Sequence, residues 1–92
     1  MKLSDIVIRN ASKGIPPKKV FDTMINAFRS LELTSDLNLF DIKALTTKAN
    51  RTFYRLRKGK YRAVFHYNDD NEILIDFIEK REVVYKWLDR LD

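Results

Sequence analysis

The chain has 92 residues, of which 45% are hydrophobic, and its formal net charge is +5. It contains no cysteine and one histidine, which excludes disulfides and leaves little for a transition-metal site, so we expect neither metal nor cofactor. No apolar run approaches the ~20 residues of a membrane span, and the first residues lack the apolar segment of a signal peptide. We therefore expect one domain, residues 1–92, in the cytoplasm and without a membrane.

The first half of the chain predicts a strand, a turn and a helix. The β-branched run Asp5–Arg9 predicts a first strand, and residues 10–14 predict a turn. Apolar residues at helical spacing predict a core-facing helix over residues 17–31, with Pro17 in its first turn. Thr34–Asp36 is a cap signal for a short second helical piece. Residues 40–45 fit either the end of that piece or an extended segment.

The segment 43–62 holds the entire positive excess of the chain. It contains 8 of the 18 basic residues and no Asp or Glu, whereas the remainder has 10 basic and 13 acidic residues. Like charges at this density repel one another, which favours an anionic partner. Nucleic acid and an acidic protein both fit this pattern.

The second part of this segment predicts a β-hairpin with Lys58 and Gly59 as its turn residues. This register places Arg55 opposite Arg62, a like-charge pair that a purely structural sheet avoids. A slip of one residue would reverse the faces of one strand. The face toward the helix is expected to carry Tyr54, Leu56, Tyr61, Ala63 and Phe65, and the other face Phe53, Arg55, Arg57, Lys60, Arg62, Val64 and His66.

The last third predicts an inner strand and a helix. Glu72–Ile78 is apolar on both sides except at Asp76, as an inner strand would be, and follows a polar turn at residues 68–71. Residues 82–91 form an amphipathic helical pattern. The fold class is therefore α+β: a mostly antiparallel twisted sheet of about four strands, packed against an N-terminal helix or short helical pair, with a C-terminal helix.

Four motifs between residues 41 and 86 together resemble the RelE/ParE toxin superfamily. They are Asp41–Leu45, Tyr54–Arg57, Gly59–Phe65 and Lys80–Lys86, in this order. The resemblance implies the toxin of a type II toxin–antitoxin system, with a cognate antitoxin as partner. A RelE-like member would cleave mRNA in the ribosomal A site without a metal, through attack of the ribose 2′-OH on the adjacent phosphate.

The resemblance also implies residues of an active site. Arg55 and Arg57 match basic strand positions of RelE, and Arg62 matches its phosphate-stabilising arginine. Arg81 and Tyr85 match the C-terminal pair, with the arginine near the leaving group and the tyrosine stacking or orienting. The sequence departs from the family pattern at residue 79, where a glutamate stands in place of a common glycine.

The identity of the general base is left open by these residues. Arginine does not give up its proton at physiological pH, so another group must deprotonate the 2′-OH. The candidates are Lys58, Lys60, Lys80, His66 and Tyr85, and none is unambiguous. The expected catalytic set is therefore Arg55, Arg57, Arg62, Arg81, Tyr85, His66 and Lys80, and the expected RNA-binding set is Lys48, Arg51, Phe53, Lys58 and Lys60.

Two other functions fit the same fold. A ParE-like member would inhibit DNA gyrase as a protein-binding module, and a degenerate member would bind RNA or a partner without cleaving it. The presence of Arg55, Arg62, Arg81 and Tyr85 argues against the gyrase inhibitor. The absence of an evident base keeps the non-catalytic alternative open.

Overall fold

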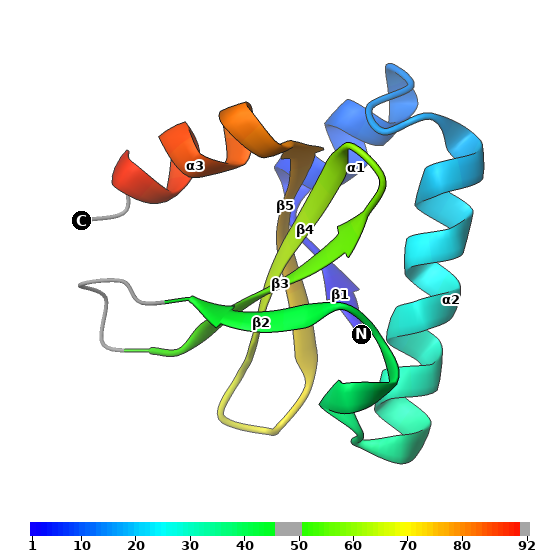
Figure 1. Cartoon of the computed structure of the whole chain (residues 1–92), viewed down its shortest axis with the longest axis vertical. Coiled ribbons are helices and arrows are strands. Elements are labelled where there is room, and N and C mark those ends of the chain that lie inside the picture. The colour runs from blue at the N-terminus through cyan, green and yellow to red at the C-terminus, as the bar shows by residue number, and fades with distance from the viewer. Residues whose placement is uncertain (46–50, 91–92) are drawn as a thin grey trace.

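A five-stranded sheet organises the part of the chain that the computed structural model describes, residues 1–45 and 51–90 (Figure 1). The strand order is β1-β5-β4-β3-β2, and all neighbours are antiparallel except the parallel pair β1 and β5. The elements in chain order are β1 (Lys2–Leu3), α1 (Asp5–Ser12), α2 (Lys18–Thr34), the 3-10 helix η1 (Leu37–Leu39), β2 (Ile42–Leu45), β3 (Phe53–Lys58), β4 (Tyr61–Tyr67), β5 (Ile73–Lys80) and α3 (Arg81–Arg90). The α+β class is confirmed, with one strand more than expected.

Both faces of the sheet are covered. The long helix α2 lies along one face, and α3 leaves the end of β5 on the other side (Figure 1). Under α2, Phe28 meets Phe65 edge to face at a centroid distance of 5.0 Å. Under α3, Phe77 stacks on Trp87 at 5.1 Å. No helix in the described ranges is both long and apolar enough to cross a membrane.

The expected first strand over Asp5–Arg9 is wrong, because these residues form helix α1. The side chain of Ser4 accepts a hydrogen bond from the Val7 amide at 3.3 Å and caps the helix. This cap, together with burial of Val7, outweighs the weak helix propensity of β-branched residues. The first strand is instead Lys2–Leu3, and the turn expected over residues 10–14 begins only at Lys13.

The α2 and η1 predictions are close to the structure. Helix α2 covers the expected residues 17–31 almost entirely and continues to Thr34, where Ser35 ends it in the left-handed region at φ 56°. Asp36 caps η1 by accepting a hydrogen bond from the Asn38 amide at 2.9 Å. The extended alternative for residues 40–45 is the correct one, since Ile42–Leu45 is strand β2.

The hairpin forms with its turn one residue later than expected. Lys58 pairs with Tyr61, so Gly59 and Lys60 are the turn residues, and Gly59 supplies the positive φ of 58°. A glycine first in a two-residue turn suits type II′, whereas the register expected from the sequence places it second. Moving the turn by one residue changes every partner by two, so both predicted faces are retained. The like-charge pair is consequently Arg57 with Arg62, and Arg55 lies opposite Val64.

Strand β5 is the inner strand that was predicted, and it contains a bulge. It spans Ile73–Lys80 between β1 and β4. Val64 pairs with Phe77 but Phe65 pairs with Ile75, so Asp76 is the extra residue. The Ser4 hydroxyl donates to the Asp76 carbonyl at 2.8 Å, which ties the start of α1 to the bulge. The C-terminal helix starts one residue before the expected 82, and residue 91 lies outside the described ranges.

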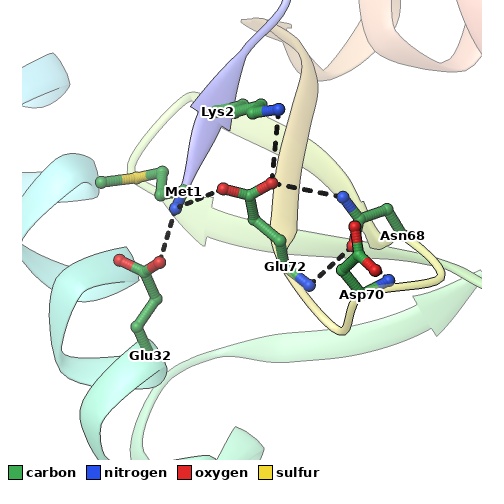
Figure 2. A network of polar contacts seen from close by, with 6 residues as sticks. All are labelled: Met1, Lys2, Glu32, Asn68, Asp70 and Glu72. Carbon is green, nitrogen blue, oxygen red and sulfur yellow. Dashed lines mark hydrogen bonds and ion pairs between the residues drawn. The ribbon is translucent and has the colours of Figure 1, made fainter.

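A network of ionic contacts joins β1, the end of α2 and the turn between β4 and β5 (Figure 2). The amino group of Met1 lies 2.6 Å from Glu32 Oε2 and 3.6 Å from Glu72 Oε2. The hydrogen bond to Glu32 raises the pKa of this amino group. Glu72 also receives a hydrogen bond from Asn68 at 3.3 Å. The network therefore holds the end of the sheet opposite to the Gly59 turn.

Two leucines of α2 provide a matched test of this core. Leu31 is 2% exposed and Leu33 is 88% exposed on the same helix. We expect Leu31→Ala to lower the free energy of unfolding by about 2–5 kcal/mol because it leaves a cavity. Leu33→Ala should change it by less than about 0.5 kcal/mol. Urea unfolding followed by circular dichroism measures both, and equal losses would contradict the packing of α2 on the sheet.

Candidate active site

A row of four charged residues crosses the sheet near the Gly59 turn. Arg57 and Arg62 are direct partners on β3 and β4. Asp41 is the next residue of the row on the side of Arg57, whose backbone amide donates to the Asp41 carbonyl at 2.9 Å. Glu79 is the next residue on the side of Arg62, as its direct partner on β5. Directly paired residues of antiparallel strands point to the same face. Two arginines thus stand side by side with one carboxylate at each end of the row.

Arg62 is the buried member of this row, with an exposure of 8%. Its Nη1 donates to the carbonyls of Gly59 at 2.9 Å and Tyr61 at 3.0 Å, which fixes the guanidinium against the turn. Burial is the main cause that lowers the pKa of Arg62, and the positive charges of Arg57 and Arg55 add to it. An anion bound here would relieve both costs.

Asp41 offsets part of the repulsion on the β3 side. Its Oδ1 lies 3.2 Å from Arg55 Nη1, and its Oδ2 lies 4.0 Å from Arg57 Nε. Arg55, Arg57 and Arg62 form an arginine cluster on this face of the sheet. Lys43 pairs directly with Arg55 on the neighbouring strand and adds a further positive charge to this cluster. One carboxylate therefore contacts two arginines, and the surface keeps an excess of positive charge.

The start of α3 brings Arg81 and Tyr85 close to the Gly59 turn. The Arg81 amide donates to the Lys60 carbonyl at 3.3 Å, which joins α3 to the hairpin turn. The Arg81 guanidinium lies 5.3 Å from the centroid of the Tyr85 ring, within the range of a cation–π contact. Lys80 ends β5 opposite Tyr61 and is exposed, and this pairing places it on the face toward α2, away from Arg62. Residues separated by about twenty positions in the chain thus gather at one corner of the sheet.

Lys58 and Lys60 stand at the same turn and are exposed. Lys58 also borders a cavity of about 400 Å³ between α2 and β3, whose apolar lining includes Met24, Ala27 and Leu56. Arg57 lines the same cavity. The basic residues of the turn therefore adjoin an apolar groove.

His66 does not join the arginine cluster, contrary to our expectation. It shares their face of the sheet, but it lies four residues beyond Arg62 on β4, or about 13 Å along the strand. Its Nδ1 is 2.7 Å from Asp76 Oδ2, and its Nε2 is 2.8 Å from Arg51 Nη1. A guanidinium only donates, so Nε2 accepts and Nδ1–H donates to Asp76. Both ring nitrogens are thus occupied within a separate cluster.

The expected RNA-binding residues lie in different parts of the structure. Arg51 belongs to the His66 cluster. Phe53 is 6% exposed and packs with Val64 under α3, so little of its ring is accessible for stacking on a base. Lys48 lies outside the described residues. Lys60 is a turn residue beside the arginines, whereas Lys58 pairs with Tyr61 on the face toward α2.

Two acidic residues of this region were not among our candidates. Asp41 and Glu79 end the charged row, and neither position follows from local sequence because each depends on strand pairing. Asp76 had a signal, since it is the polar residue in an otherwise apolar strand. Across the described stretches of the chain, no three His, Cys, Asp or Glu side chains gather as metal ligands.

Comparison with solved structures identifies the fold. The chain resembles a chain of the RelB–RelE antitoxin–toxin complex of Methanococcus jannaschii, with a TM-score of 0.73 and 22% sequence identity. The match covers 95% of this chain and 98% of the matched chain. It also resembles a chain of the RelE–RelB complex of Pyrococcus horikoshii, with a TM-score of 0.67 and 23% sequence identity. This match covers 87% of this chain and 91% of the matched chain. No protein-family model and no curated protein matches the sequence. The chain therefore has a RelE-like fold.

Asp76 provides a test of the second cluster. Burial raises the pKa of its carboxyl, while the hydrogen bond from His66 and the charge of Arg51 oppose this. The folded pKa thus lies above the unfolded value of about 3.9. The folded protein then binds the proton more tightly, so this stability is present below the unfolded pKa and is lost as pH rises through the folded pKa.

Carbon-detected NMR of the Asp76 carboxyl measures the folded pKa directly, and urea unfolding of wild type and Asp76→Asn across the same pH range measures its effect. The stability of wild type relative to Asp76→Asn should decrease with rising pH. An increase would mean that the contacts with His66 and Arg51 outweigh burial.

Proposed function

We propose that this protein is the toxin of a toxin–antitoxin system and acts as a RelE-like, ribosome-dependent mRNA endonuclease. The observation that carries the proposal is the gathering of Arg57, Arg62, Arg81 and Tyr85 at the hairpin turn. These are the positions that the family resemblance assigns to its active site. The RelE-like fold over nearly the whole chain supports the same function.

The arginines suit the charge that develops during cleavage. Attack of a ribose 2′-OH on the adjacent phosphate creates a pentavalent phosphorus with extra negative charge on its oxygens. Arg62, held by two carbonyls, and its partner Arg57 would receive this phosphate through charge-assisted hydrogen bonds. Arg81 would lie near the departing 5′-oxygen, and the Tyr85 ring beside it would stack on or orient the RNA.

The proposed partner is a cognate antitoxin, which would be acidic or amphipathic. The two solved structures described above are both complexes of RelE with RelB. The basic turn would attract acidic side chains, and the apolar groove beside α2 would accept apolar ones. Val83 and Tyr85 on α3 are 40% and 41% exposed and extend the surface that such a partner would cover.

Substitution of the arginines tests the proposal. Arg62→Ala and Arg81→Ala should each reduce cleavage of ribosome-bound mRNA, Arg62→Ala by about 10²–10³-fold because it removes stabilisation of the transition-state charge. Both should relieve the growth arrest that follows expression. Primer extension on mRNA after induction maps and quantifies the cuts.

Arg29→Ala is the matched control, since Arg29 is an exposed residue of α2 and lies outside the arginine cluster. It should cleave and arrest growth as wild type does. Growth arrest without cuts in translated mRNA would reject the endonuclease. If DNA damage accompanies that arrest, a ParE-like action on gyrase would replace it.

A further inference from the structure

We propose that Glu79 is the general base that removes the proton from the 2′-OH. This inference rests on the proposed endonuclease function and supplies the group that the arginines cannot. The family pattern offers no guide here, because glycine is common at this position. The inference comes from the pairing of β4 with β5, which makes Glu79 the direct partner of Arg62.

The position of Glu79 is that of a group facing the bound phosphate. Direct partners in an antiparallel pair have Cβ atoms about 5 Å apart on the same face. Glu79 therefore lies beside the arginine that would hold the phosphate, and it precedes Arg81 by two residues. A 2′-oxygen in line with the phosphorus lies within one nucleotide of that phosphate, so a base must stand next to Arg62.

The Glu79 carboxylate has one oxygen held and one available. Oε2 accepts a hydrogen bond from the Lys80 amide at 2.8 Å, which orients the group. Among the described residues, no lysine or arginine nitrogen lies within 4.0 Å of it, and the side chain is half-buried. Asp41, at the other end of the row, contacts Arg55 and Arg57 instead. Oε1 of Glu79 has no hydrogen-bond partner among the described residues, so it can accept a proton.

The other candidate bases are less suitable for positional or chemical reasons. His66 has both ring nitrogens occupied in a different part of the sheet. A lysine must first lose its own proton, whereas a carboxylate is ionised at neutral pH and accepts a proton without prior deprotonation.

The proposed step is balanced in bonds and protons. Glu79 Oε1 takes the proton of the 2′-OH as the 2′-oxygen forms a bond to phosphorus and the bond from phosphorus to the 5′-oxygen breaks. The upstream fragment ends in a 2′,3′-cyclic phosphate. The 5′-oxygen takes a proton from water and becomes a hydroxyl, and Glu79 returns its proton to water.

Single-turnover cleavage of mRNA on programmed ribosomes tests this role. Glu79→Gln and Glu79→Ala should lower the rate by at least about 10²-fold, the usual contribution of a general base. Glu79→Asp should retain intermediate activity. Added formate should restore part of the rate to Glu79→Ala, where the removed side chain leaves room, and chloride at equal ionic strength should not. Glu82→Gln, a carboxylate substitution three residues away, should cleave at a rate close to wild type.

Four results would overturn the proposal, and they separate it from the proposed function. Wild-type rates in Glu79→Gln, with Arg62→Ala inactive, would leave the endonuclease intact without Glu79 as its base. Loss in Asp41→Asn with full activity in Glu79→Gln would move the base to Asp41. Loss in Glu79→Ala that formate does not restore, with a lowered Tm, would make Glu79 a structural residue of the α3 start. Absence of cleavage by the wild-type protein would reject the endonuclease and this base together.

Discussion

The placement of Arg57 directly opposite Arg62 is the constraint on which the rest of the site depends. Two guanidinium groups on paired strands repel each other, and one of them is buried. Nearby acceptors stabilise these groups. Two carbonyls at the turn accept hydrogen bonds from Arg62, and the Asp41 carboxylate contacts Arg57 and Arg55. These contacts fix the groups without neutralising the cluster, because Arg81 and Lys43 add further charge. The site is therefore ready for an anion before any ligand arrives.

Much of this arrangement could be predicted from the sequence, and the limits have physical causes. The two faces of the hairpin follow from alternation alone, which is why they are right although the turn position is wrong. The turn position depends on the conformation of Gly59, and the sequence is compatible with a turn at either Lys58–Gly59 or Gly59–Lys60. The sequence does not predict helix α1, because the Ser4 cap and the burial of Val7 together outweigh the weak helix propensity of a β-branched run.

The parts that could not be predicted depend on pairing between distant strands. Glu79 meets Arg62 only because β5 pairs with β4 in this register, and the sequence contains no local sign of it. The bulge at Asp76 is similar, since an extra residue in one strand is not visible in its apolar pattern. That bulge turns Asp76 toward His66, so the one histidine of the chain serves a buried hydrogen-bonded cluster with Arg51 at the other end of β4.

The hairpin turn at Gly59 also has a consequence for how this fold can vary. Because side-chain direction depends only on odd or even position along a strand, the turn can move by one residue, which lengthens one strand and shortens the other, without exchanging the faces of the hairpin. The arginines would then change partners but stay on the same surface, as the difference between the two turn placements illustrates. Movement of the turn would therefore preserve the surface chemistry of the hairpin while changing which side chains lie directly opposite one another.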